Sequence, residues 1–531
     1  MGFAQVDNKG LFLRESNSRV LLLGVLFAAG FCLRLYRIGQ PPMDFAGVRQ
    51  YHSALLARGF YEWLLTGNLK TLPPDGIIEP PILELLASLS YMITGAELLW
   101  IPRVLSAIFW MVGGLFLYLI ARKIVSPNAA VFSVAFYLLD PAVVLPSRAF
   151  MPDPLMIMML LVSVYTILRY HEQPTTGRLI VAVAASSMAL FVKPGICLFQ
   201  VFGVFVALMV YGRGLIRTLS SGHLYLFTIL SLLPMGLYYA WFLQGAAAAR
   251  ISLETLLSVH LWRGWLWQIE YMVGYVAFAG ALLGVLLLRP GLPRALMVGM
   301  WGGCFVFGSV FTYHIHTHGY YSLQFVPVVA LSLGSVWDKS GAYTRRRDPH
   351  FYRRAIVLGL MVLVGAIGVV EQRITILGIA RQDQGAVPFP GRYLGSVLIA
   401  DYERRAENYR EIGHIVDNSP RTIFSAPDFG YPLLYYGRLD GEYWPTPDMM
   451  RWWRSRGRAA SHLEGAATRR ELFDKWYFEV SPEYFVVIRS EEWRDDRETK
   501  WLIKRHFPNV ARDRYYSVFD LRKGDYRSKP R

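Results

Sequence analysis

Long apolar runs are the feature that most constrains the fold of this chain. A helix that crosses a bilayer needs about 20 predominantly apolar residues. Because backbone polar groups in lipid must be hydrogen-bonded internally, such runs predict helices and not irregular segments. The sequence offers eleven candidate spans, at residues 20–37, 102–121, 128–145, 154–170, 178–192, 195–211, 222–243, 270–288, 293–312, 322–337 and 354–371.

The composition indicates two joined parts. The 531-residue chain is 54% hydrophobic and 18% charged, whereas soluble domains average about 45–50% apolar and about 25% charged residues. After about residue 371 the apolar runs stop. The stretches "RTIFSAPD", "YFVVIRS" and "YYSVFDL" then predict strands, and "YERRAENYREIGHIVD" and "ATRRELFDKWYFEV" predict helices. We therefore expect an α-helical polytopic membrane domain over residues 1–371 and an α/β domain over residues 372–531.

Basic residues alternate between the loops in a way that predicts the topology. Cytoplasmic loops are enriched in Lys and Arg. If the N-terminus is cytoplasmic, the loops expected inside carry two or more basic residues each, ending with the strongly basic "DKSGAYTRRRDPHFYRR". The loops expected outside are poorer in basic residues, and "HIHTHGYYS" has none. This pattern predicts a multi-pass plasma membrane protein whose segment 38–101 and C-terminal domain are extracytoplasmic.

The net charge of +16 does not indicate nucleic acid as a partner, because the basic residues are divided between inner loops and an external tail. Anionic lipids and phosphate-bearing substrates fit this distribution better. Cys32, Cys197 and Cys304 all lie in apolar runs and the sequence places none of them near another, which argues against a disulfide framework. The first span has no small-residue cleavage signature, so we expect it to be retained.

Two segments of the external loop 38–101 have helical periodicity. In the first, Val48, Tyr51 and Leu55 share one face and Arg49 and His52 another. In the second, an apolar stripe is formed by Ile82, Leu85, Leu86 and Leu89. Such amphipathic helices lie flat at a membrane interface or simply pack on the helix bundle, and the sequence leaves both alternatives open.

Ionisable and aromatic residues from separate parts of the sequence fall at the outer ends of the predicted spans. They are Asp44, Arg103, Asp140, Arg148, Asp153, Lys193, His314, His316, His318, Tyr320 and Tyr321. If the helices bundle, these side chains converge on one outer cavity. Cations at membrane depth are costly unless they are paired or face water. A polyprenyl phosphate would supply an anion for Arg and Lys, and a partly desolvated carboxylate would be a suitable general base.

This ordered set of segments resembles the GT-C superfamily of membrane glycosyltransferases, of the protein O-mannosyltransferase and aminoarabinose-transferase type. The resemblance is carried by "PPMDFAGVRQYHSALLARG", "EPPILELLASLSYMITG", "PRVLSAIFWMVGGLFLYLIARKI", "PSRAFMPDPLMIMMLL", "ALFVKPG" and "GYYSLQFVPVVALSLG". It implies an inverting glycosyltransferase that moves a sugar from a polyprenyl-phosphate-linked donor to an acceptor hydroxyl on a glycan, lipid or protein.

The resemblance also implies roles by position. Asp44 matches the first-loop carboxylate, and would be the general base. Asp153 matches a second carboxylate, which shapes the sugar or acceptor site. Arg148 and Lys193 match positions that face the lipid phosphate. The other residues expected to bind substrate are Arg49, Glu79, Arg103, His318, Tyr320 and Tyr321.

Two departures from the family pattern leave metal use open. Many relatives carry Asp-Glu where this chain has Asp44-Phe45, and many carry His before the double proline where this chain has Glu79. No cofactor is certain; a divalent metal ion remains open, with Asp44, Glu79 and His316 as candidate ligands.

Each site residue also has a plain structural interpretation. Asp44 and Asp153 could cap helices, Arg148 could contact headgroups, and Lys193 could extend along its apolar stem to the interface. At the level of the whole chain, the alternative function is a transporter or flippase for a glycolipid. Transporters place charged residues near the midplane within paired halves, whereas these residues gather at the outer ends and no two-fold hydropathy repeat is visible.

Overall fold

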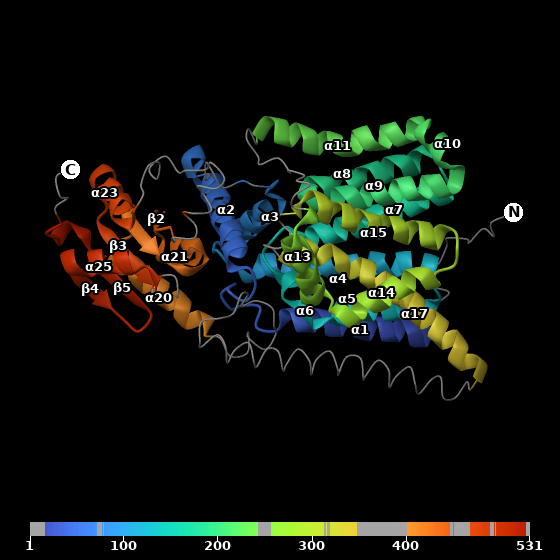
Figure 1. Ribbon diagram of the computed structural model, residues 1–531, viewed down its shortest axis with the longest axis horizontal. Helices are drawn as coiled ribbons and strands as arrows, with labels where there is room; N and C mark the ends of the chain where they lie inside the picture. The colour runs from blue at the N-terminus through green and yellow to red at the C-terminus, as the bar shows by residue number, and fades with distance from the viewer. Residues whose placement is uncertain are drawn as a thin grey trace. The chain divides into compact units, whose positions relative to one another are not determined.

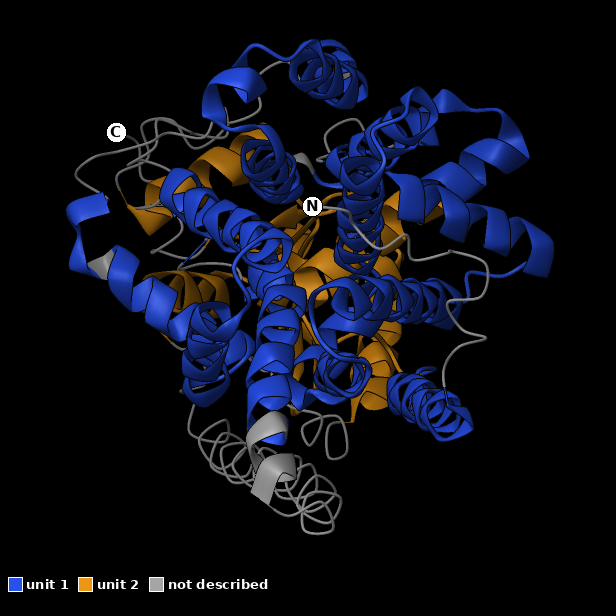
Figure 2. Cartoon of the chain, turned by 90° about the vertical axis from the view of Figure 1, so that its right-hand side faces the viewer, with its two compact units in different colours: residues 1–39, 59–379, 389–398 blue, residues 40–58, 380–388, 399–531 orange. Residues whose placement is uncertain are grey.

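The computed structural model describes residues 16–71, 77, 79–242, 256–312, 315, 319–347, 401–445, 450, 468–488, 493 and 495–526. The chain divides into two compact units (Figure 2). Unit 1 comprises residues 1–39, 59–379 and 389–398, and unit 2 comprises residues 40–58, 380–388 and 399–531. The domain boundary expected near residue 371 lies outside the described residues.

Unit 1 is helical, and its long helices run side by side (Figure 1). Its helices, in chain order, are α1 (Asn17–Leu35), the second part of α2 (Gly47–Thr66), η1 (Leu69–Thr71), α3 (Ile82–Thr94), α4 (Trp100–Ile124), α5 (Pro127–Leu139), α6 (Pro141–Val144), η2 (Pro146–Arg148), α7 (Asp153–Glu172), α8 (Thr176–Val192), α9 (Pro194–Arg213), α10 (Leu215–Leu219), α11 (Gly222–Phe242), α13 (Val259–Met272), α14 (Tyr275–Leu287), α15 (Leu292–Val310), η3 (Gly319–Gln324) and α17 (Phe325–Arg347).

The helices confirm a polytopic membrane fold. Ten of the predicted apolar runs coincide with helices in the described part of the chain, and the run at 354–371 lies outside it. Among the described residues, six helices are long and apolar enough to cross a membrane, and two bent helix pairs raise the number to as many as eight. The bent pairs replace the straight spans predicted at 128–145 and 270–288, with angles of 60° and 96°.

Local sequence explains both bends. Asp140 follows α5, and its side chain accepts a hydrogen bond from the amide of Ala142 at 3.1 Å, which caps α6 at a new start marked by Pro141. The second bend lies at Gly274, which has a φ of 75°. Side chains rarely adopt this left-handed conformation, so glycine allows the chain to leave α13 and begin α14 in a new direction.

The middle of unit 1 is built from tightly packed helices. α7 packs on α4 and α8, and α17 packs on α5 and α14. Between α4 and α5 the rings of Trp110 and Tyr137 stack with centroids 4.4 Å apart, and both side chains are buried. Stacking and burial of such large rings contribute strongly to packing, and here they join α4 to α5.

The two periodic segments of the external loop behave differently. In α3 the predicted apolar stripe points outward, because Leu85, Leu86 and Leu89 are exposed while Glu84 and Tyr91 are buried. An exposed apolar stripe on a membrane protein fits a helix that faces lipid. In α2, by contrast, Tyr51 of the predicted apolar face is fully buried. Its hydroxyl donates to that of Tyr436 at 3.2 Å, so this face packs on protein.

The described part of unit 2 is an α/β domain, as predicted. Its elements are the first part of α2, α20 (Tyr402–Ile415), β1 (Thr422–Ser425), η4 (Pro427–Gly430), α21 (Tyr431–Gly437), β2 (Glu442–Tyr443), α23 (Arg469–Glu479), β3 (Tyr484–Ile488), α25 (Arg497–His506), β4 (Asn509–Arg512), β5 (Tyr516–Asp520) and η5 (Leu521–Lys523). The five strands have the order β2-β1-β3-β5-β4. β1 is parallel to β2 and β3, and β5 is antiparallel to β3 and β4.

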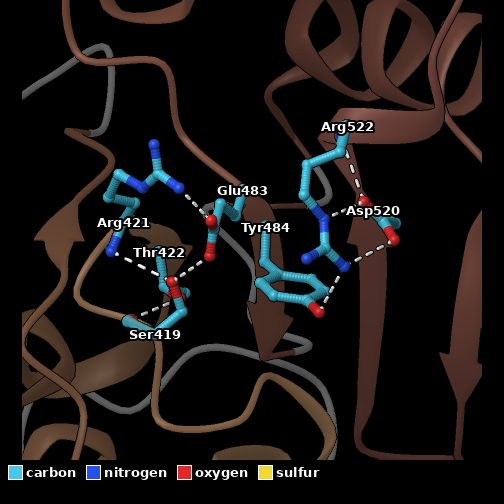
Figure 3. Close-up of polar contacts among 7 residues, drawn as sticks. All are labelled: Ser419, Arg421, Thr422, Glu483, Tyr484, Asp520 and Arg522. Carbon is cyan, nitrogen blue, oxygen red and sulfur yellow. Dashed lines mark hydrogen bonds and ion pairs between the residues drawn. The ribbon is translucent and has the colours of Figure 1, made fainter.

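Polar contacts hold the edge where β1 and β3 begin and β5 ends (Figure 3). Glu483 accepts hydrogen bonds from Ser419 and Arg421. Arg522 donates to Asp520 at 2.9 Å and to the hydroxyl of Tyr484 at 2.6 Å. The contacts of Glu483 join the beginnings of β1 and β3, and the contact of Arg522 with Tyr484 joins β5 to β3, so together they fasten three strands at one edge.

The segment 40–58 belongs to the core of unit 2 although it is far from the rest in sequence. Met43 packs on a buried cluster that includes Ile412, Phe424 and Val518. A Cβ atom built at Gly47 would lie 3.0 Å from Oδ2 of Asp428, so the start of α2 and η4 are in close contact. No feature of the sequence indicated that residues 40–58 pack with the C-terminal domain.

Candidate active site

Five of the predicted site residues come together in unit 1. Asp153 is the first residue of α7, Lys193 joins α8 to α9, and Glu79 lies three residues before α3. Tyr320 and Tyr321 belong to η3. These residues come from four distant parts of the chain, and Lys193 contacts all the others. We call this set the lysine cluster.

The charged residues of the lysine cluster stand where prolines define helix starts. Glu79, Asp153 and Lys193 each directly precede a proline, at residues 80, 154 and 194. Proline disfavours helical conformation in the residue before it. Lys193 accordingly leaves the helical region, with φ −156° and ψ 88°, and separates α8 from α9. Asp153 begins α7, where a carboxylate also interacts favourably with the helix dipole.

The geometry surrounds the Lys193 ammonium with carboxylates and aromatic rings. Nζ donates to Oδ1 and Oδ2 of Asp153 at 2.8 and 2.9 Å, and lies 3.6 Å from Oε1 of Glu79. It also lies 5.0 Å from the ring centroid of Tyr320 and 4.6 Å from that of Tyr321. Both ring distances are within the range of a cation–π interaction.

Burial makes these contacts strong. Lys193 is 2% exposed, and Asp153 is fully buried. Two charges removed from water are stable only if they are paired with good geometry, and the loss of one partner typically costs about 3–5 kcal/mol. The lysine cluster contains one more carboxylate than ammonium. The phosphate-binding role that the resemblance implies for Lys193 stays a prediction, but its ammonium already neutralises a carboxylate.

Arg103 and Arg148 have partners on one short stretch of backbone. Arg148, fully buried, donates through Nη1 to the carbonyls of Arg34 and Tyr36. Arg103, also fully buried, donates through Nη1 to the carbonyl of Ile38 at 2.8 Å. The carbonyls at a helix C-terminus lack partners within the helix, so the two arginines bind the end of α1 and the segment after it. Their predicted contacts with substrate are untested.

In the described part of unit 1, two buried charged residues were missed by the sequence analysis. Arg34 in α1 is fully buried and donates to Ser147 at 2.7 Å and to the carbonyl of Leu138 at 2.9 Å. Glu84 in α3 is buried next to the exposed apolar stripe. A charged residue inside an apolar run was a visible signal for Arg34, because such residues are rare in spans and have specific partners.

Asp44 and Arg49 are placed in unit 2. Asp44 is 3% exposed, and its Oδ1 accepts a hydrogen bond from the Gln50 amide at 3.3 Å. The same amide donates to the carbonyl of Phe45 at 2.6 Å, which closes the loop before α2. His52 packs edge-on against Tyr431. Asp44 is therefore a buried carboxylate in an ordered loop, and its role as general base stays a prediction.

The candidate metal ligands do not fit a metal ion in the part of the chain that the structure describes. His316 and His318 lie outside it. Within it, no group of three or more His, Cys, Asp and Glu side chains is close enough to hold a metal ion. Glu79, the candidate ligand that belongs to the lysine cluster, lies next to the Lys193 ammonium.

Comparisons with known proteins support the membrane fold. Residues 78–241 match the family described as dolichyl-phosphate-mannose-protein mannosyltransferase. The structure resembles ArnT from Cupriavidus metallidurans bound to undecaprenyl phosphate, with a TM-score of 0.56, 14% identity, and coverage of 96% of this chain and 98% of that chain. The apo state of the same protein gives a TM-score of 0.56 and 14% identity over 95% and 98% of the two chains.

A further solved structure is less similar. AglB, the archaeal oligosaccharyltransferase from Archaeoglobus fulgidus in complex with an inhibitory peptide and a dolichol-phosphate, has a TM-score of 0.49 and 13% identity over 89% of this chain and 69% of that chain. No curated protein matches the sequence significantly. At 14% identity, the likeness to ArnT establishes the fold alone, which this chain shares with ArnT.

Proposed function

On the premise that this chain is a multi-pass membrane protein of the GT-C type, we propose that it is an inverting glycosyltransferase that uses a polyprenyl-phosphate-linked sugar. The observation that carries the proposal is the lysine cluster, in which residues from distant segments, singled out for this chemistry, contact one ammonium. The family match over residues 78–241 and the fold of ArnT support it.

The proposed reaction needs one base and one leaving group. The carboxylate of Asp44 takes the proton from an acceptor hydroxyl, whose oxygen attacks the anomeric carbon of the sugar. The bond between that carbon and the phosphate oxygen breaks, and the polyprenyl phosphate leaves with the electron pair. Attack opposite to the leaving group inverts the anomeric configuration. Burial of Asp44 in an ordered loop supports its role, since a carboxylate largely removed from water is a suitable general base.

The lysine cluster would serve the sugar. Tyr320 and Tyr321 offer aromatic rings and hydroxyls of the kind that bind sugars, and the Lys193 ammonium fixes the orientation of Asp153. We propose an extracytoplasmic site on the plasma membrane, with a glycan, lipid or protein as acceptor. This orientation rests on the distribution of basic residues among the loops.

The Asp44→Asn variant tests the mechanism. General bases contribute about 10²–10⁴-fold to rates, so we expect a loss of that size in transfer from a synthetic polyprenyl-phosphate sugar. The asparagine oxygen can still accept the hydrogen bond from Gln50, so the thermal unfolding temperature should match that of the wild type. Transfer is measured in nanodiscs by mass spectrometry of the product, with a panel of acceptor lipids, glycans and peptides.

Asp440→Asn is the matched control, because Asp440 is an exposed aspartate of the same unit. It should retain full activity. Full activity of Asp44→Asn would remove the proposed mechanism. Movement of the labelled glycolipid across proteoliposomes, with no new glycosidic linkage under any condition, would instead favour the transporter alternative.

A further inference from the structure

We propose that the ammonium of Lys193 takes the place of a divalent metal ion in this protein, so that its carboxylates work without a metal. The inference deepens the proposed function and concerns the same site. The resemblance left open whether the site uses a metal ion. In the described residues, two carboxylates already share one cation, the ammonium of Lys193.

The carboxylates around Lys193 converge on its ammonium as they would on a metal ion. Asp153 presents both carboxylate oxygens to Nζ, at 2.8 and 2.9 Å, and Glu79 approaches from another segment at 3.6 Å. Carboxylates from separate elements that converge on one point are the usual protein ligands of Mg²⁺ and Mn²⁺. Here the point of convergence holds a covalently attached positive charge, which repels a metal ion and competes for the same oxygen atoms.

The tyrosine rings support the assignment to an ammonium. Tyr320 and Tyr321 lie with their ring centroids 5.0 and 4.6 Å from Nζ. An aromatic face stabilises an organic cation through its quadrupole, whereas Mg²⁺ and Mn²⁺ prefer oxygen ligands and retain bound water. Two rings and two carboxylates around Nζ are therefore suited to an ammonium, and the two carboxylates become available to a divalent ion only when that ammonium is removed.

The positioning role follows from this arrangement. Lys193 neutralises one negative charge beside the proposed sugar site and holds Asp153 through both oxygens, without touching the reacting atoms. Pro194 disfavours helical conformation at Lys193, which lies between α8 and α9. The backbone position of Lys193 is therefore set by the break between these two helices. A resident ammonium cannot be lost to chelation.

Binding of Mn²⁺ to the full-length protein, measured by electron paramagnetic resonance in nanodiscs after treatment with EDTA, tests the inference. The wild type should show no saturable binding up to about 1 mM, the weak end of the range for protein sites of hard divalent ions. Lys193→Met keeps a similar stem but removes the charge. It should gain one site per chain, at least about tenfold tighter than any wild-type binding, because the repulsion is removed.

Two variants give the controls. Lys193→Met/Asp153→Asn should lose the gained site, which shows that Asp153 supplies it. Lys123→Met removes the ammonium of a salt bridge with Glu172, 2.7 Å long and away from the lysine cluster, and should gain no site. A saturable wild-type site that Asp153→Asn or Glu79→Gln abolishes would overturn the inference, and so would a folded Lys193→Met protein that gains no binding.

The wild-type measurement stands if Lys193→Met fails to fold. In that case the charge-conserving variant Lys193→Arg should fold and, like the wild type, bind no Mn²⁺; a saturable site in it would overturn the inference. The binding measurement uses no glycosyl donor, so it separates this inference from the proposed function. Loss of transfer in EDTA with recovery in Mn²⁺ would refute the inference alone, while absence of transfer under all conditions would count only against the proposed function.

Discussion

Two carboxyls at the edge of the sheet of unit 2, those of Glu483 and Asp520, have a lowered pKa. Hydrogen bonds from Ser419 and then Arg421 hold the pKa of the Glu483 carboxyl below the ordinary value of 4.5. Asp520 is similar, since the hydrogen bond from Arg522 lowers the pKa of its carboxyl below 3.8. A carboxyl whose pKa is lower in the folded state stabilises the fold above its unfolded pKa, and this stability is lost as the pH falls through the folded pKa.

We predict that Glu483→Gln lowers the thermal unfolding temperature at pH 7 and that the gap to wild type closes as the pH is lowered below 4.5. Protonated glutamate and glutamine are equally uncharged, which is the reason for the convergence. Tryptophan fluorescence during heating provides the measurement. Glu442→Gln is the control, because Glu442 is exposed on β2. A gap that persists unchanged at pH 3 would contradict the prediction.

Local sequence indicated where the charged residues of the lysine cluster lie, but not which partners they contact. Glu79, Asp153 and Lys193 each precede a proline at a helix start, which places their side chains at helix ends where charged groups can meet. Arg148 and Arg103 were expected to bind substrate, and the structure shows them donating to backbone carbonyls. The sequence cannot distinguish an arginine that donates to a backbone carbonyl from one that donates to a phosphate, because the guanidinium is a hydrogen-bond donor toward either acceptor.

At the scale of elements, the packing of α9 on α15 depends on glycines. A Cβ atom at Gly303 would lie 2.4 Å from Cα of Gln200, and one at Gly203 would lie 2.5 Å from the carbonyl oxygen of Gly299. Both neighbours are backbone atoms that cannot rotate away. Small residues at helix interfaces in membranes allow backbones to approach closely, and packing then drives association.

We predict that Gly303→Ala destabilises the protein by about 1–3 kcal/mol, the usual cost of overpacking a tight interface. Gly302→Ala is a matched control in the adjacent position, because nothing lies within 4 Å of a Cβ atom built there. Thermal unfolding in detergent, followed by size-exclusion chromatography, measures the difference. Equal unfolding temperatures for the two variants would show that α9 and α15 are less closely packed than described.

At the scale of the whole molecule, each of the two units is made of segments that are not consecutive in the sequence. Residues 40–58, which carry Asp44, belong to unit 2 with the C-terminal domain, although residues 59–379 and 389–398 of unit 1 lie between them and α20 in the sequence. Arg58 stacks over the ring of Tyr435 at 4.0 Å and donates to its carbonyl at 3.0 Å. The C-terminal domain thus supports the segment of the proposed base, a role for it that the sequence did not suggest.

We predict that Arg58→Met loosens residues 47–58 from the rest of unit 2. Loss of a cation–π contact and a charged hydrogen bond costs about 1–2 kcal/mol, so amide hydrogen exchange in this segment should accelerate about tenfold or more. Mass spectrometry of peptic fragments measures the exchange. Arg405→Met, which removes an exposed arginine near Tyr402, should leave these amides unchanged. Unaltered exchange in Arg58→Met would show that this arginine does not hold the segment.

The sequence by itself determined many of the elements: in the described part of the chain the apolar runs became helices, the strands at 422–425, 484–488 and 516–520 formed as predicted, and prolines set the helix starts beside the charged residues. These features depend on local periodicity and backbone sterics, which adjacent residues decide. Only the tertiary structure decided which charges meet, that the first loop packs in unit 2, and that Lys193 is shared by Asp153 and Glu79. Such pairings join residues distant in sequence, and their energy depends on burial and distance, which no local pattern contains.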